Sequence, residues 1–158
     1  MPQPSTIHNT FVLERSYPTA PERVFAAFTD PDKKSRWLLG GDRSRVQHYD
    51  LDFRTGGTER AAILLPEGTP VAGLVCSSET IYQNIVLNQR IVSTSTMSIA
   101  GNCISVALVT FELVPTEAGT DLILTHQAAF FEGADGPAMR EDGWRKLLDS
   151  LSAELSAQ

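Results

Sequence analysis

The feature that most constrains the fold is a single long helical pattern at the C-terminus, which follows a series of strand patterns. Over residues 137–156, leucines and Trp144 recur at helical spacing and form one apolar stripe. The preceding segments alternate apolar and polar residues, and their connections are too short for parallel crossovers. These patterns predict an α+β domain in which a seven-stranded, curved antiparallel sheet wraps around the helix. The strands are expected at residues 7–17, 45–54, 58–65, 71–86, 90–99, 103–114 and 120–131.

Two short helices are expected after the first strand. Thr19 and Glu22 have the spacing of a capping box for the first helix. Asp30 can cap the second helix, which extends through Trp37. In the same way, Asp135 can cap the long C-terminal helix. Side-chain caps are therefore predicted at the start of all three helices.

Glycines mark the turn between the second and third strands. The pair Gly56-Gly57 predicts a hairpin turn in which at least one residue has a positive φ, a conformation that glycine adopts without steric cost. The long fourth strand is expected to contain a bulge, either near residues 77–78 or near residues 82–83.

Composition limits the class of protein. The chain has 158 residues and a net charge of −6, with no cluster of Lys and Arg, which argues against nucleic-acid binding. No apolar stretch reaches the roughly 18 residues of a membrane helix, and residues 1–10 do not resemble a secretory signal. We expect one cytoplasmic domain over residues 1–158, with residues 1–6 as a loose tail. Whether it forms a homodimer is left open.

The metal-binding residue types have no recognisable spacing. Cys76 and Cys103 lie in apolar strand patterns, and we interpret them as small buried residues rather than as a disulfide or a metal pair. His8, His48 and His126 do not have the spacing of metal ligands. No metal and no cofactor are expected.

Several motifs occur in a characteristic order along almost the whole chain. They are residues 20–25, 28–31, Trp37, residues 52–57, 84–86, 88–92 and 120–126, and Gly143-Trp144 with Leu147 and Leu151. Together these motifs resemble the START-like (SRPBCC, helix-grip) superfamily. Within it, the chain is similar to the branch named after the C-terminal domain of the activators of the heat-shock chaperone ATPase. One departure is Leu87, in a turn position where the family commonly has proline.

The resemblance implies a fold with a cavity between sheet and helix. Other branches of the superfamily bind lipids, steroids or polyketides, and some cyclise or hydrolyse them. A contact with the chaperone is implied by the family name alone, because true activators carry an additional N-terminal domain that we do not expect here.

Strand parity makes His126 the most notable ionisable residue, since it shares a face with Leu122, Leu124 and Phe130. It can serve as a polar anchor for a ligand, as a general acid or base, or as a buried histidine bonded to a backbone carbonyl. Trp144 lies on the helical stripe and is expected to face the sheet, as core or as a wall of the cavity.

We therefore predict a non-catalytic binding module for a small hydrophobic molecule. The alternatives are a cyclase or hydrolase that uses His126, and a chaperone-linked interaction module. A cavity with buried ionisable groups would favour the enzyme, and an exposed apolar patch would favour the interaction module. The predicted lining residues are Trp37 at the cavity mouth, Tyr49, Phe53, Phe111, His126 as the anchor, Phe130, Met139 and Trp144.

Overall fold

The computed structural model describes residues 5–157, so residues 1–4 of the expected tail lie outside the described part. Seven strands form one antiparallel sheet in the order β1-β7-β6-β5-β4-β3-β2. The strands are β1 (Ile7–Tyr17), β2 (Val46–Leu51), β3 (Thr58–Leu64), β4 (Val75–Val86), β5 (Arg90–Ile99), β6 (Asn102–Pro115) and β7 (Thr120–Phe130). The helices are α1 (Pro21–Thr29), α2 (Pro31–Leu38) and α3 (Pro137–Ser156), with a short 3-10 turn at Arg43–Arg45.

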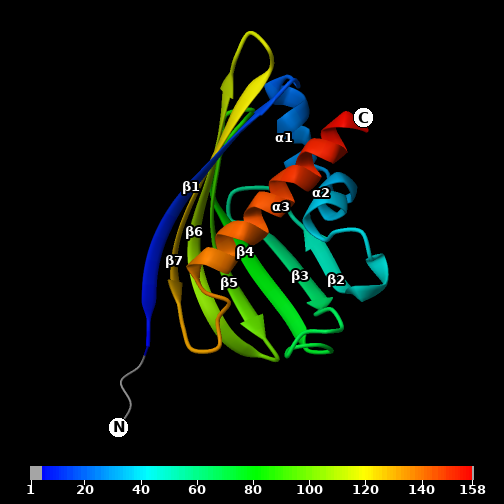
Figure 1. Ribbon diagram of the computed structural model, residues 1–158. Helices are drawn as coiled ribbons and strands as arrows, with labels where there is room; N and C mark the ends of the chain where they lie inside the picture. Colours follow the sequence, from blue (N-terminus) through cyan, green and yellow to red (C-terminus); the bar gives the residue numbers. More distant parts are fainter. Residues whose placement is uncertain (1–4, 158) are drawn as a thin grey trace.

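The sheet curves around α3, which crosses its concave face, while α1 and α2 lie beside the C-terminal half of α3 (Figure 1). Alternate residues of the strands point into this space, and those from β1, β6 and β7 form most of the buried core. Leu148, Leu151 and Leu155 of α3 complete the core. The predicted helix-grip architecture is confirmed. No helix within residues 5–157 is long and apolar enough to cross a membrane.

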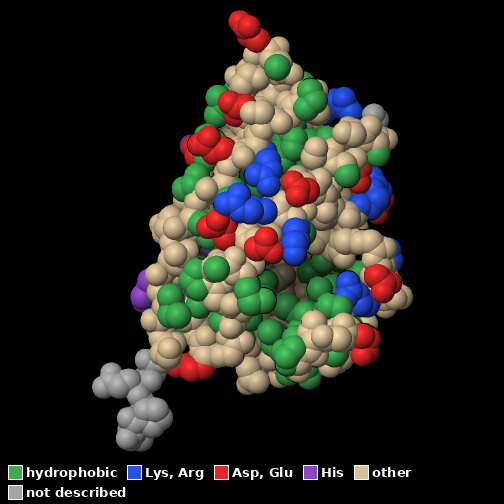
Figure 2. All heavy atoms as spheres, viewed as in Figure 1, with side chains coloured by type: hydrophobic (Ala, Val, Ile, Leu, Met, Phe, Trp, Pro, Cys, Tyr) green, Lys and Arg blue, Asp and Glu red, His purple; other side chains and the backbone are tan. Residues whose placement is uncertain are grey.

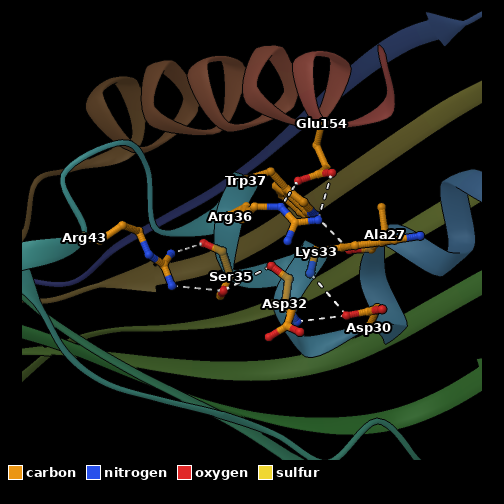
Figure 3. Close-up of polar contacts among 9 residues, drawn as sticks. All are labelled: Ala27, Asp30, Asp32, Lys33, Ser35, Arg36, Trp37, Arg43 and Glu154. Carbon is orange, nitrogen blue, oxygen red and sulfur yellow. Dashed lines mark hydrogen bonds and ion pairs between the residues drawn. The ribbon is translucent and has the colours of Figure 1, made fainter. Parts of the chain in front are cut away.

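Polar contacts fix the position of α2 (Figure 3). The Asp30 carboxylate accepts hydrogen bonds from the first turn of the helix, as predicted for its cap. The indole Nε1 of Trp37 donates to the carbonyl of Ala27 at 2.9 Å, which joins α2 to α1. The guanidinium of Arg36 donates two hydrogen bonds to Glu154 of α3. These contacts join α2 to both other helices.

Two predicted side-chain caps are wrong. Helix α1 has Ala20 as its N-cap residue, one residue later than the predicted Thr19, and no side chain caps it. Thr19 is buried, and its backbone carbonyl accepts a hydrogen bond from the Thr120 hydroxyl. Helix α3 begins after Gly136, again without a side-chain cap. The Asp135 carboxylate instead binds Arg140, five residues further along the chain.

The turn at residues 56–57 has two different requirements for glycine. Gly56 has a φ of +83°, as predicted. Gly57 is tightly enclosed, since a Cβ there would lie 2.1 Å from the carbonyl oxygen of Asp52. Both glycines also hydrogen-bond to the backbone of Tyr82, where the β4–β5 register shifts. The bulge therefore lies near residues 82–83, one of the two predicted positions.

Two other details differ from prediction. Strand β4 begins at Val75 rather than at residue 71, because residues 66–74 form turns. The thiols of Cys76 and Cys103 are free as expected, but Cys103 is exposed rather than buried. It follows the turn at residues 100–101, next to the register shift between β5 and β6.

Of the two tryptophans, Trp37 lies elsewhere than predicted, whereas Trp144 faces the sheet as expected. Trp37 was predicted at the mouth of the cavity, but it is 1% exposed and packs edge-on against Phe28 in the core. Trp144 is only partly buried and contacts Phe111 and His126. The shorter helix thus supplies the core tryptophan.

We expect Trp37→Ala to lower the free energy of unfolding by about 3–5 kcal/mol, because it empties a fully packed site and removes a buried hydrogen bond. Trp144→Ala should cost clearly less, because the indole is half-buried. Urea denaturation of both variants measures the difference. Equal losses would show that Trp144 is as much a part of the core as Trp37.

Alanine substitutions at three glycines should separate strain from crowding. Gly57→Ala should destabilise most, because the backbone of residue 52 must move. Gly56→Ala should cost about 1–2 kcal/mol through its positive φ alone. Gly41→Ala is the control, since its φ is not positive and its Cβ would meet open space. Thermal melts of the three variants should rank in this order, and a Gly57→Ala variant as stable as Gly41→Ala would contradict it.

Candidate ligand-binding cavity

A cavity of about 410 Å³ lies between the sheet and the N-terminal half of α3. Its walls come from α2, from β3 to β6 and from α3. Figure 2 shows a hollow below the charged side chains of α3, bordered by hydrophobic side chains. The volume falls in the range of roughly 300–1,000 Å³ that is usual for small-molecule sites.

The helices and β6 supply an apolar wall. Helix α3 presents Met139, Gly143, Trp144 and Leu147 to the cavity. Met139 is 68% exposed, which places it at the opening. The remaining apolar side chains of this wall are Phe28, Leu38, Leu39, Val109 and Phe111. Such a surface favours an apolar ligand through the hydrophobic effect.

The neighbouring strands β4 and β5 supply a wall rich in hydroxyl groups. Ser78 and Thr80 alternate along β4, and Ser93 and Ser95 alternate along β5, so their side chains share the concave face. Thr80 donates a hydrogen bond to Ser95 at 3.3 Å. The apolar residues Ile91 and Met97 complete the β5 part of this wall.

A buried ion pair stands at the α2 end of the cavity. The Nζ of Lys34 lies 2.9 Å from the carboxylate of Glu59, and both side chains are less than a tenth exposed. Burial by itself would lower the pKa of Lys34, but the carboxylate of Glu59 outweighs this and raises it. Lys34 is therefore protonated and positively charged at neutral pH.

Two tyrosines accompany this pair. The hydroxyl of Tyr49 donates to Glu59 at 2.7 Å. The hydroxyl of Tyr82 is buried close to Lys34, in a geometry that gives no standard hydrogen bond to any described residue. Burial raises the pKa of Tyr82 to about 12, against the opposing effect of Lys34. Both hydroxyls are protonated at neutral pH, since burial also raises the pKa of Tyr49.

A second ion pair joins the β7–α3 loop to the first turns of α3. The Nε and Nη2 of Arg140 each donate to Asp135 at 2.8 Å, and Nη2 also donates to the Ser105 hydroxyl at 3.0 Å. The guanidinium stacks over the ring of Phe130, 5.0 Å from its centroid. These contacts hold the start of α3 at the edge of the cavity.

The charges of the lining balance one another, and its thiol is protonated. Its four charged residues form two pairs of opposite charge, so their formal charges sum to zero. Cys76 also lines the cavity, but burial raises the pKa of its thiol, which keeps it protonated. In the described part of the chain, no histidine lines the cavity beside this thiol as a base.

Three of the eight predicted lining residues, Phe111, Met139 and Trp144, line the cavity. Trp37 and Phe130 lie in the core, and Phe53 packs between Phe25 and Tyr82. Tyr49 does not line the cavity, but its hydroxyl donates a hydrogen bond to Glu59, which does. Strand and helix periodicity placed these residues on the inner face, but the depth at which each lies depends on its neighbours.

His126, the predicted anchor, is buried between sheet and helix but does not line the cavity. Its ring stacks on Phe11 with centroids 4.6 Å apart, and Trp144 lies on another side at 6.5 Å. Its Nδ1 has no hydrogen-bond partner among the described residues. Burial, helped by the charge of Arg140, lowers the pKa of His126 to about 4, so the ring is neutral at pH 7.

Sequence reasoning missed the charged residues of the lining, although two signals pointed to them. Glu59 shares strand parity with Ala61 and Ile63, which places it on the inner face. Arg140 precedes Trp144 by one helical turn and lies on the same stripe. For Lys34 the one available signal was its position three residues before Trp37, which places both on the same face of the helix.

We expect Lys34→Met to destabilise the domain by about 3–5 kcal/mol, because it leaves the Glu59 carboxylate buried without its counterion. The double variant Lys34→Met, Glu59→Leu should recover most of the loss. The control is Arg60→Met, which breaks an ion pair whose two side chains are half exposed and should cost at most about 1 kcal/mol. Urea denaturation tests this, and a double variant no more stable than Lys34→Met would contradict it.

His126 should make stability depend on pH. Its folded-state pKa of about 4 lies below the ordinary 6.5, so the unfolded chain binds a proton first as the pH falls. The contribution of His126 to the free energy of unfolding is then fully present above pH 6.5. It is lost as the pH falls toward 4, by up to about 3 kcal/mol. His126→Phe should remove this part of the pH dependence, whereas His48→Asn, at an exposed position, should retain it. Identical pH profiles for wild type and His126→Phe would contradict the assignment.

Comparisons with known proteins agree with this architecture. An uncharacterised protein from Rhizobium leguminosarum has 30% sequence identity and a TM-score of 0.91, with 99% of this chain and 100% of that chain covered. The protein Mll3558 from Rhizobium loti has 41% identity and a TM-score of 0.84, with 95% and 99% covered. The AHSA1-like protein from Aeromonas hydrophila shares the fold at 18% identity, with a TM-score of 0.65 over 94% and 93% of the chains. The search of curated proteins found no match.

The family comparison covers most of the chain. Residues 18–156 match the model of the "Activator of Hsp90 ATPase homolog 1-like protein" family. This range runs from the residue after β1 to the end of α3 and includes the whole cavity lining. The chain therefore belongs to the family of activator of Hsp90 ATPase homolog 1-like proteins, within the START-like superfamily.

Proposed function

We propose that this domain binds a small, largely apolar molecule in the cavity between the sheet and α3. The observation that carries the proposal is the cavity itself, about 410 Å³ with a mostly apolar lining inside an otherwise packed fold. Interiors of folded domains are close-packed, so an open apolar space of this size has a cost in stability. Occupation by a ligand offsets that cost.

An enzyme that acts on a hydrophobic substrate is the second candidate. The observation that favours it is the buried Lys34–Glu59 pair, since ionisable groups in a cavity were the feature expected of a catalyst. However, Glu59 already accepts hydrogen bonds from Lys34 and Tyr49, which weakens it as a base. A chaperone-linked role has its support in the family description alone.

Gly143 offers a way to test binding without damage to the fold. It lies in α3, lines the cavity, and a Cβ there would meet open space. Gly143→Leu should fill part of the cavity and abolish binding of the neutral fluorescent probe N-phenyl-1-naphthylamine. Gly143→Ala is the matched control and should retain binding while it stabilises the helix by roughly 0.5–1 kcal/mol.

Probe fluorescence measures binding, and thermal melts verify that both variants fold. Native mass spectrometry of the protein from its own host would identify a co-purified molecule. If the probe binds the wild type and Gly143→Leu equally well, the cavity is not the binding site. If the protein converts an added ligand into a different compound, the catalytic alternative is favoured instead.

A further inference from the structure

Between the two ion pairs at its ends, the cavity has one mainly apolar wall and one wall rich in hydroxyl groups. Helix α3 presents carbon and sulfur atoms through Met139, Trp144 and Leu147. The opposite wall presents hydroxyl groups from two adjacent strands, with Ser93 next to Tyr82 toward the α2 end and Ser78 next to Met97 toward the Arg140 end. Polarity therefore varies across the cavity, from sheet to helix, rather than from one end to the other.

The wall hydroxyls have hydrogen-bonding capacity to spare. Thr80 donates to Ser95. The hydroxyls of Ser78 and Ser93 bond to no side chain or backbone group within residues 5–157; Ser93 is buried, Ser78 is partly buried, and both line the cavity. A hydroxyl covered by a purely apolar ligand would lose its hydrogen bonds to water without replacement. The wall is thus complementary to a ligand that carries oxygen atoms on the side that faces β4 and β5.

The charges of the lining favour an uncharged ligand. Lys34 is paired with Glu59, and Arg140 with Asp135, so that each buried cation already has its own carboxylate. A ligand carboxylate or phosphate would be a buried charge without a free counterion, which is costly. A fatty acid fits poorly for a second reason, because its chain would cover the hydroxyl wall with methylene groups.

We infer that the cavity selects uncharged molecules that carry oxygen atoms along one edge and are apolar along the other. The oxygen-bearing edge lies against the hydroxyls of Ser78, Thr80, Ser93 and Ser95. The apolar edge lies against Trp144 and Leu147 of α3. This inference rests on the proposed function and adds the chemical class of the ligand.

Two isomers test the position of the oxygen atoms directly. 2,7-Dihydroxynaphthalene carries both hydroxyls toward one long edge, 2,6-dihydroxynaphthalene carries them toward opposite edges, and both are uncharged at pH 7. The 2,7 isomer should bind about two- to tenfold more tightly, the factor that one additional net hydrogen bond provides. Naphthalene-2-carboxylate and decanoate should bind more weakly than either diol. Isothermal titration calorimetry with the full-length protein measures all four affinities.

Serine variants test whether the hydroxyl wall of β4 and β5 causes the preference for the 2,7 isomer. Ser93→Ala and Ser78→Ala should reduce the ratio of the affinities for the two diols toward one. Ser98→Ala is the matched control, since Ser98 lies on β5 but does not line the cavity, and it should keep the wild-type ratio. Because the ratio compares two isomers on the same variant, a general change in stability does not alter it.

The outcomes separate this inference from the proposed function. Binding of the diols with equal affinity, or tightest binding of either carboxylate, would overturn the inference and leave the proposed cavity function intact. If neither the diols nor N-phenyl-1-naphthylamine binds, both fail. A preference for the 2,7 isomer that Ser93→Ala and Ser98→Ala reduce equally would overturn the assignment to the hydroxyl wall.

Discussion

The packing of α3 on the concave face of the sheet organises both the core and the cavity. Its C-terminal half is sealed into the core by Leu148, Leu151 and Leu155, which are nearly inaccessible. The hydroxyl of Tyr17 on β1 donates to the carbonyl of Leu148 at 3.0 Å and fixes this half against the sheet edge. The N-terminal half continues the same apolar stripe but lies over open space. One amphipathic helix therefore closes the core at one end and roofs the cavity at the other.

The cavity stays open because its ends are held by polar contacts rather than filled by apolar side chains. At one end the Lys34–Glu59 pair connects α2 to β3. At the other end Arg140 binds Asp135, Ser105 and the ring of Phe130, which ties the start of α3 to its preceding loop and to the sheet. Buried ion pairs add little net stability but are costly to break, so they fix geometry at both ends. This arrangement also leaves the lining without net charge, which is the basis for the uncharged ligand proposed above.

His126 shows why a position on the inner face is not the same as a position in a site. Strand parity placed its side chain correctly between sheet and helix. However, Phe11 stacks on the ring, and Trp144 and Phe130 lie beside it, so the cavity is lined by other residues. The same distinction applies to the tryptophans, because the short helix α2 is enclosed by α1 and α3 and buries Trp37 more deeply than the long helix buries Trp144.

The order of the elements, the antiparallel sheet, the cap at Asp30 and the turn at Gly56 could all be predicted from the chain, because each is encoded by local periodicity, capping or backbone conformation. So could the face of each strand that points inward. Tertiary structure decided the depth of each inward side chain and the partners of the charged ones. Lys34 and Glu59 are 25 residues apart on different elements, and Asp135 binds Arg140 instead of capping a helix. Packing between elements decides the Lys34–Glu59 pairing and the depth of each side chain, and no local pattern in the chain encodes them.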